Sequence, residues 1–462
     1  MNIFLDILDR GLTGQYCSEK EWNMRFFPSV INKALKKYEL QNTCNSKIPI
    51  NFDDELADRF WEAGLEVATE VGMLNTSTER IIKFTREEII TGLNRACGFW
   101  RAGWGRDAVD VVPRVPEDSR PPITVLGPIG DLLSEELFIP IHQSSAQNWS
   151  LDGISTGVLA TVHGREIRTG TPYETLAGAL DSRMLREALI RAGRPGMVLC
   201  GPDTEPSEYG AFGGWNTPNG VEISQIGAIA LPPAELKVDY HILHKAAHGV
   251  NLKSHILAGH WSMIGGYAGG PEGCGVAAVA ASIMMTMVLL PTTVQADVMD
   301  TRYLGNVGRD CVWSTSVSRQ AINRNSHILE LHVINPVSGV LSEALLREVA
   351  VGALQCTTSG VAMIIGVRTA GGKFPNHASG VETGFAGEVA KAAAGMTREQ
   401  ANEIANQLLP KYEDDLKRPN IGVSFPEAYN VETVTPNKEW LDMYRKIKRE
   451  VAALGVPFGR WE

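Results

Sequence analysis

A single cysteine, Cys200, follows the short apolar run Met197-Val198-Leu199, which lies between two Gly/Pro breaks. Such a run predicts a buried strand that carries the thiol at its carboxyl end, with a turn directly after it. In α/β folds, catalytic groups gather at the carboxyl ends of strands. Free cysteines are also among the most buried residues in proteins. Position alone favours a structural role for this thiol, and a functional role stays open.

Seven of the ten histidines lie between residues 241 and 332. His244 and His248 are four residues apart on a predicted helix, a spacing that can bind a metal ion. The residues between them, Lys-Ala-Ala, offer no carboxylate general base, which favours a packing or hydrogen-bonding role. A zinc site built from Cys200 and two histidines is a minor alternative, because zinc accepts thiolate and imidazole ligands together.

Aromatic residues are concentrated in loops after predicted strands. They are Tyr209, Phe212, Trp215, Trp261, Tyr267 and Trp313. Aromatic faces that point into a cavity bind cationic amines through the ring quadrupole, most favourably quaternary ammonium groups. Ordinary core packing explains each of these side chains equally well. Glu222 lies in another loop between predicted strands, where an isolated carboxylate is usually solvated.

Short apolar runs alternate with helical patterns from about residue 122 onward, and these elements must position the candidate residues. The predicted strands are 123–126, 197–200, 228–231, 298–299 with its flanks, and 361–366. The predicted helices are 172–192, 235–248, 275–290, 308–323 and 342–355. This alternation predicts a parallel sheet, and the number of units favours a closed barrel over an open sheet. We assign residues 1–118 to an N-terminal helical extension, 119–395 to the barrel, and 396–462 to a C-terminal helical segment packed on it.

The composition of the 462-residue chain excludes several classes of protein. A net charge of -10 without a dense basic stretch argues against nucleic-acid binding. The seven cysteines form no CxxC pair, so a disulfide framework is not indicated and a reducing cytoplasm fits best. The apolar run from Val276 to Leu290 is shorter than the roughly 20 residues that span a bilayer. We therefore expect a cytoplasmic protein with no membrane partner, in which this run is a buried helix.

From about residue 50 to its C-terminus, the chain resembles the corrinoid-dependent monomethylamine methyltransferases. The matching segments, in the same order, are 76–85, 105–109, 193–197, 235–239, 265–270, 387–390 and 433–436. The resemblance implies an α/β fold, a TIM-type (β/α)8 barrel with an N-terminal helical extension and C-terminal helices. It also implies a homo-oligomer, a hexamer in that family, and a small corrinoid protein as partner. The chain itself would hold no tightly bound cofactor, because the partner presents the corrinoid (cobalamin).

The chain departs from that family at the catalytic positions. Cys200 stands where the family has pyrrolysine, an electrophilic imine that adds the amine, and a thiol cannot be that electrophile. Glu222 matches a family carboxylate. Gly259, Val333 and Asn335 replace a glutamate, a glutamine and a tyrosine. Coordinated change of this kind indicates a paralogue with a different substrate.

Three functions follow as hypotheses. The first is a pyrrolysine-independent methyltransferase that moves a methyl group from a small methylated compound, such as a quaternary amine, to Co(I) of a corrinoid protein. Its predicted catalytic residues are Cys200, Glu222, His260 and His332, and its predicted substrate-binding residues are Trp215, Trp261, Tyr267, Trp313 and Asn335, with no bound metal. The second is a zinc- or thiolate-dependent transferase built on Cys200 and its neighbouring histidines. The third is a barrel that binds a ligand without catalysis.

Overall fold

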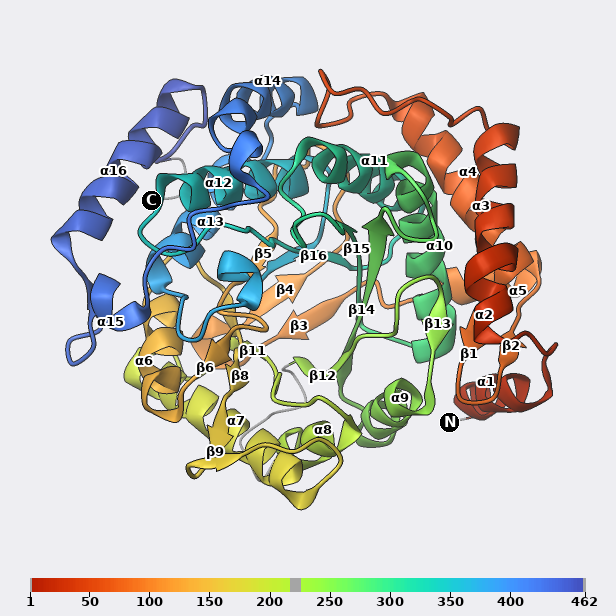
Figure 1. Ribbon diagram of the computed structural model, residues 1–462, viewed down its shortest axis with the longest axis horizontal. Helices are drawn as coiled ribbons and strands as arrows, with labels where there is room; N and C mark the ends of the chain where they lie inside the picture. The colour runs from red at the N-terminus through yellow and green to blue at the C-terminus, as the bar shows by residue number, and fades with distance from the viewer. Residues whose placement is uncertain (1, 217–225, 460–462) are drawn as a thin grey trace.

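Eight parallel strands form a closed barrel in the computed structural model, which describes residues 2–216 and 226–459 (Figure 1). Around the barrel the strands follow the order β11-β12-β14-β15-β16-β17-β5-β7. Their bounds are β5 Ile123–Val125, β7 Gly153–Ser155, β11 Val198–Cys200, β12 Ile226–Ala230, β14 His255–Ile264, β15 Thr293–Asp300, β16 Glu330–Val333 and β17 Met363–Ile365. The predicted TIM-type (β/α)8 barrel is thereby confirmed.

A helix follows each strand and covers the outside of the barrel (Figure 1). These helices are α6 Glu135–Ala146, α7 Pro172–Arg191, α8 Glu208–Gly214, α9 Tyr240–Leu252, α10 Pro271–Leu289, α11 Arg309–Asn325, α12 Glu343–Thr358 and α13 Gly380–Ala392. The helix predicted at 235–248 begins later, at Tyr240, because Asp239 caps it through the backbone N–H of Ile242. Lys237 and Val238 form the short strand β13 instead.

Three barrel strands, β7, β14 and β16, were missing from the sequence prediction. Each carries polar residues that break an apolar run, such as His260 in β14 and Glu330 in β16. The side chains of His260 and Glu330 are buried and hydrogen-bonded to other polar groups, so the apolar-run criterion does not detect their strands. Helix α10 was predicted correctly as a buried helix, and its residues from Gly273 onward are all buried. In length and hydropathy α10 would suit a membrane span, but 94% of its most apolar window is buried inside the protein.

The N-terminal region is not wholly helical. It contains α1 Asn2–Thr13, α2 Glu19–Glu21, the π-helix Trp22–Phe26, α3 Phe27–Lys37, α4 Asp54–Val71 and α5 Arg86–Leu93. It also contains the strands β1 Met73–Asn75, β2 Arg80–Ile82, β3 Trp100–Ala102 and β4 Val109–Val111. β1 pairs with β13 of the barrel region, which joins the extension to the loop after β12. The start of α5 has the predicted capping box, formed by Thr85 and Glu88.

The hairpin β3–β4 closes the amino-terminal end of the barrel. Trp100, Ala102 and Val111 belong to the same apolar cluster as the interior residues Val198 and Leu257. The backbone N–H of Trp104, just after β3, donates to the carbonyl of Gly196, just before β11. The carboxyl end is therefore the end of the barrel at which a site can form.

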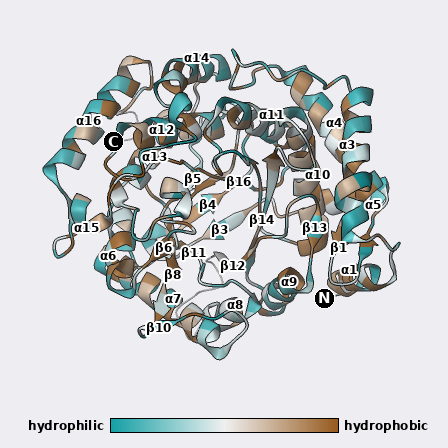
Figure 2. Cartoon of the chain, in the orientation of Figure 1, coloured by the Kyte–Doolittle hydropathy of each residue, from teal (hydrophilic) through white to brown (hydrophobic). Residues whose placement is uncertain are grey.

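The C-terminal helices α14 Arg398–Leu408, α15 Phe425–Ala428 and α16 Lys438–Ala453 lie at the periphery, where α16 packs on α12 and α13 (Figure 1). α16 buries Trp440, Ile447 and Val451 on one face. Figure 2 shows hydrophilic stretches on the outer helices α3, α4 and α16, as expected for amphipathic helices on a surface.

Candidate functional site

Cys200 faces the interior of the barrel at the carboxyl end of β11. Its side chain is completely buried and belongs to one cluster with Val125, Ile229 and Val333, against which Trp261 packs. Ser155, at the carboxyl end of β7, is its register neighbour. The sequence prediction of a strand-end thiol is confirmed. The thiol forms part of a packed layer that the solvent does not reach.

This environment keeps the thiol protonated. Burial raises the pKa of Cys200 well above its usual range, and the nearby carboxylates of Asp203 and Glu205 raise it further. A reactive cysteine needs the opposite conditions, with cations close by and access to solvent. The geometry therefore opposes a thiolate mechanism.

Asp203 lies above this layer, at the open end of the barrel. Its Oδ2 accepts the backbone N–H of Gly130 at 2.7 Å, so the side chain reaches from the loop after β11 to the loop after β5. In the barrel, β7 lies between β11 and β5, so this hydrogen bond spans the end of β7 at the mouth. Burial raises the pKa of Asp203, while Lys245 and Arg368 oppose that increase.

Two more buried carboxyl groups flank Asp203. Asp131 is 1% exposed, and burial raises its pKa well above the usual range in spite of Arg368. Glu205 forms a buried ion pair with Lys245 at 3.0 Å, and burial raises the pKa of Glu205 to about 8. Among the described residues, these three carboxyl groups lie near two cations, Lys245 and Arg368, and a further buried carboxyl group, Asp181, lies close to Asp203. We name Asp131, Asp203 and Glu205 the mouth carboxylates.

Toward the carboxyl end of the interior, Ser155 Oγ, Gln295 Nε2 and Asn335 Oδ1 lack a hydrogen-bond partner among the described residues. Asn335 is held by Asn306, whose Oδ1 accepts its backbone N–H at 2.9 Å. Buried polar atoms without a partner are costly, and they mark places where a water or a polar ligand fits. Asn335, predicted as a substrate-binding residue, lies just after the carboxyl end of β16 and faces the barrel interior.

The predicted aromatic cage is not formed. Of its four members, Trp261 faces the barrel interior, and Tyr267 lies in the loop after β14 with 42% of its surface exposed. Trp215 is buried among the outer helices, with its ring 5.2 Å from His248. Trp313, on α11, packs edge-to-face on Phe60 at 5.8 Å. The prediction is wrong for Trp215 and Trp313, because both rings are needed to fill the helical layer.

Neither predicted catalytic histidine faces Cys200. Side chains alternate along a strand, and Leu257 and Trp261 face inward, so His260 faces outward. His260 Nε2 accepts the backbone N–H of Leu236, and burial together with Lys237 lowers the pKa of His260 to about 3. His332, which likewise faces outward from β16, has Nδ1 2.5 Å from Asp297 Oδ1. Within the part of the chain that the structure describes, His, Cys, Asp and Glu form no group that could hold a metal ion.

Glu222, one of the predicted catalytic residues, lies outside the described residues. The mouth carboxylates Asp203 and Glu205 were not predicted, although the sequence contains a signal for them. They follow the strand of Cys200 directly, in the order Cys-Gly-Pro-Asp-Thr-Glu, and side chains just after a barrel strand belong to the mouth.

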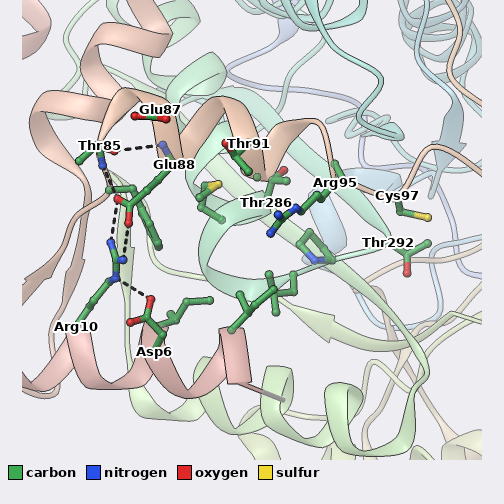
Figure 3. Close-up of a pocket in the computed structure, with 18 residues that line it drawn as sticks. Asp6, Arg10, Thr85, Glu87, Glu88, Thr91, Arg95, Cys97, Thr286 and Thr292 are labelled. Atoms are coloured by element: carbon green, nitrogen blue, oxygen red, sulfur yellow. Dashed lines mark hydrogen bonds and ion pairs between the residues drawn. The ribbon is translucent and has the colours of Figure 1, made fainter.

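A cavity of about 620 Å³ lies between α1, α5 and the end of α10 (Figure 3). It borders Thr292, immediately before β15, and therefore lies at the end of the barrel away from the mouth carboxylates. In Figure 3, Arg10 contacts both Glu88 and Asp6, so this arginine is already engaged by two carboxylates of the cavity wall. We place the functional site at the barrel mouth, because this cavity lies at the end of the barrel that the β3–β4 hairpin closes.

Comparison with known proteins gives consistent matches over the whole chain. Residues 1–456 match the family model described as monomethylamine methyltransferase MtmB. The monomethylamine methyltransferase MtmB of Methanosarcina mazei is 31% identical over 458 residues, which cover 98% of each chain. MtmB1 of Methanosarcina acetivorans is 30% identical with the same coverage. The crystal structure of Methanosarcina barkeri MtmB superposes with a TM-score of 0.95 at 30% identity, covering 98% of both chains.

Proposed function

Because the chain belongs to the monomethylamine methyltransferase MtmB family, we propose that it moves a methyl group from a small methylated ammonium compound to Co(I) of a partner corrinoid protein, without pyrrolysine. The partner presents the corrinoid as the methyl acceptor. The methyl donor differs from that of the named relatives in being a quaternary ammonium cation.

The excess of carboxyl groups at the mouth carries this proposal. Asp131, Asp203 and Glu205 face two cations, Lys245 and Arg368. When all three are ionised, their negative charges exceed the two positive charges by one, and a bound cation would stabilise that ionised form against the effect of burial, which raises their pKa values. Trp261 adds an aromatic face within the same end of the barrel. These features favour a cationic substrate over a neutral or anionic one.

The type of cation follows from the leaving group. The methyl group passes to Co(I) as the C–N bond breaks; its electron pair leaves with the amine, and cobalt is formally oxidised to Co(III). A monomethylammonium ion can lose its proton in a poorly hydrated site and then becomes an amine with a very poor leaving group. A quaternary ammonium ion has no such proton, so it needs no imine adduct. Orientation by the barrel walls and electrostatic stabilisation supply the rest.

The partner would dock on the rim of the mouth. Large apolar side chains are exposed there on loops that follow different strands, among them Leu132, Leu231, Tyr267 and Leu304. Exposed apolar side chains that ring an opening are typical of protein interaction sites. A partner that covers this rim would bring its corrinoid to the substrate and exclude water.

The proposed role of Cys200 is to pack the floor of the site rather than to react. We therefore expect Cys200→Ala and Cys200→Ser to keep methyl transfer within about threefold of the wild-type rate, because neither variant removes an ionised group. The measurement is the rate of methyl-Co(III) formation. Loss of activity in both variants, with unchanged thermal stability, would instead assign the thiol to the chemistry.

The proposed function is tested with purified chain, a corrinoid protein reduced to Co(I), and a panel of amines. Tetramethylammonium and other quaternary ammonium compounds should give methyl-Co(III) absorbance, whereas monomethylamine should not. Turnover with monomethylamine and none with quaternary compounds would overturn the proposed substrate class. A thermal shift on addition of a quaternary amine, with no methyl-Co(III) formed, would favour the non-catalytic barrel.

A further inference from the structure

Behind β14, a strained turn joins the N-terminal extension to the barrel. Glu235 and Leu236 both have left-handed backbone conformations, with φ of 69° and 55°. Such conformations are unfavourable for residues with a Cβ, and they persist where the surroundings hold them.

Three separate elements hold this turn. The indole N–H of Trp22 donates to the carbonyl of Glu235 at 2.8 Å. The backbone N–H of Leu236 donates to His260 Nε2 at 3.3 Å, and the carbonyl of Leu236 accepts from the N–H of Leu74 at 3.0 Å. Contacts from the extension and from β14 thus fix a conformation that the local sequence does not favour. His260 therefore helps to hold this turn as a hydrogen-bond acceptor, outside the barrel interior.

The turn places the Glu235 carboxylate under the loop after β14. Glu235 is 3% exposed, and its Oε1 accepts the backbone N–H of Tyr267 at 3.3 Å. A Cβ at Gly266 would lie 3.0 Å from the same oxygen and 3.0 Å from the carbonyl of Met263, so the glycine leaves room for the carboxylate and for the turn. The other oxygen, Oε2, has no hydrogen-bond partner in the described ranges 2–216 and 226–459.

The loop itself is a compact turn, residues 265–270. The N–H of Gly265 donates to the carbonyl of Gly269, and the N–H of Gly266 donates to the carbonyl of Met263. These bonds close the loop on itself and on β14. The contact with Glu235 instead ties it to a different element, at the residue whose ring is exposed on the rim.

We propose that Glu235 is a positioning residue, which fixes the 265–270 loop and Tyr267 at the barrel mouth and couples them to the N-terminal extension. The inference rests on the proposed function only in treating the mouth as the site. An ionised carboxylate accepts a hydrogen bond more strongly than a carboxylic acid, so the ionisation of Glu235 tightens the loop.

The charged and titratable groups around Glu235 determine the pH at which it ionises. Burial raises the pKa of Glu235 to about 7, against a weaker opposing effect of Lys237. Lys237 is itself paired with Glu19 at 2.9 Å. Cys274, on α10, and His260, on β14, complete the surroundings, and burial keeps both of these uncharged. The loop should therefore be held more tightly as the pH rises through about 7.

Hydrogen exchange of the full chain, followed by mass spectrometry of peptides that cover 265–270, tests this directly. After division by the intrinsic exchange rate, protection of the Tyr267 amide in the wild type should rise about tenfold between about pH 6 and pH 8. Glu235→Gln keeps the size and an acceptor oxygen but cannot ionise, so its protection should not change with pH. Glu62→Gln, an exposed glutamate paired with Arg86 on the periphery, should behave like the wild type.

A second variant guards against a general loss of structure. Gly266→Ala should lower the protection of the loop at every pH, because its Cβ would approach both Glu235 Oε1 and the Met263 carbonyl at 3.0 Å, while the peptides of α10 stay protected. A rise in protection in Glu235→Gln equal to that of the wild type would overturn the inference, as would a pH-independent wild type. Because the readout is amide exchange, these outcomes are distinct from a failure of the methyl-transfer assay.

Discussion

Replacing Asp203 with asparagine should lower kcat/KM for a quaternary ammonium donor by about 100-fold, or about 2.7 kcal/mol of transition-state stabilisation. Asparagine preserves the shape of the side chain, and its Oδ1 can still accept the N–H of Gly130. It removes one of the three mouth carboxylates and leaves Lys245 and Arg368 unchanged, so the site loses one group that can carry the negative charge that attracts the cation. The measurement is the rate of methyl-Co(III) formation as a function of substrate concentration.

The pH dependence of KM provides an independent check on this result. In the wild type, KM should fall as the pH rises toward and beyond about 8, because Glu205 ionises with a pKa of about 8 and the ionised mouth attracts the cation more strongly. Asp203→Asn should retain this trend at a higher KM throughout. Asp110→Asn, an exposed carboxylate paired with Arg101 at the closed end of the barrel, is the matched control. If Asp203→Asn and Asp110→Asn lose the same amount of kcat/KM, the loss does not arise from the charge at the mouth.

The sequence predicted the barrel because the strands 123–125, 198–200 and 363–365 are apolar and short, and lie between helical patterns. β14 and β16 escaped prediction for a common physical reason. Their outward side chains, His260 and Glu330, are buried against polar groups of the outer layer rather than apolar ones. A pattern based on apolar runs contains no information about such pairings.

The site was predicted less well than the fold, and side-chain direction explains the difference. His260 and Trp261 are adjacent in sequence, yet alternation along β14 places them on opposite faces of the barrel wall. Without the strand assignment, the sequence could not decide which of the two belongs to the interior. Asp203 could have been recognised from its place just after β11, since its role depends on chain order alone.

Arg319→Met should destabilise the fold by about 3–5 kcal/mol, the largest structural effect that we expect. Arg319, on α11, is completely buried and bonds Asp297 of β15 and Glu330 of β16, each at 2.6 Å. His332 and Arg319 outweigh the effect of burial and hold the pKa of Asp297 below its usual range. Without the guanidinium, Glu330 would lose its cation and Asp297 would be left with its side-chain contact to His332. Thermal unfolding should show a decrease in Tm of roughly 5 °C or more.

Two further variants identify buried charge as the cause of that loss. Arg324→Met, one turn later on the same helix, removes an arginine that is paired with Asp54 and Asp58 at the surface, and should cost less than about 1 kcal/mol. Adding Asp297→Asn and Glu330→Gln to Arg319→Met should recover part of the lost stability, because the remaining groups no longer need a cation. If the triple variant is no more stable than Arg319→Met, the loss comes from packing of the arginine stem instead. Recovery would show that the ion network stabilises the pairing of β15 with β16. The network would thereby also help to position Asn335, which follows β16 and faces the barrel interior.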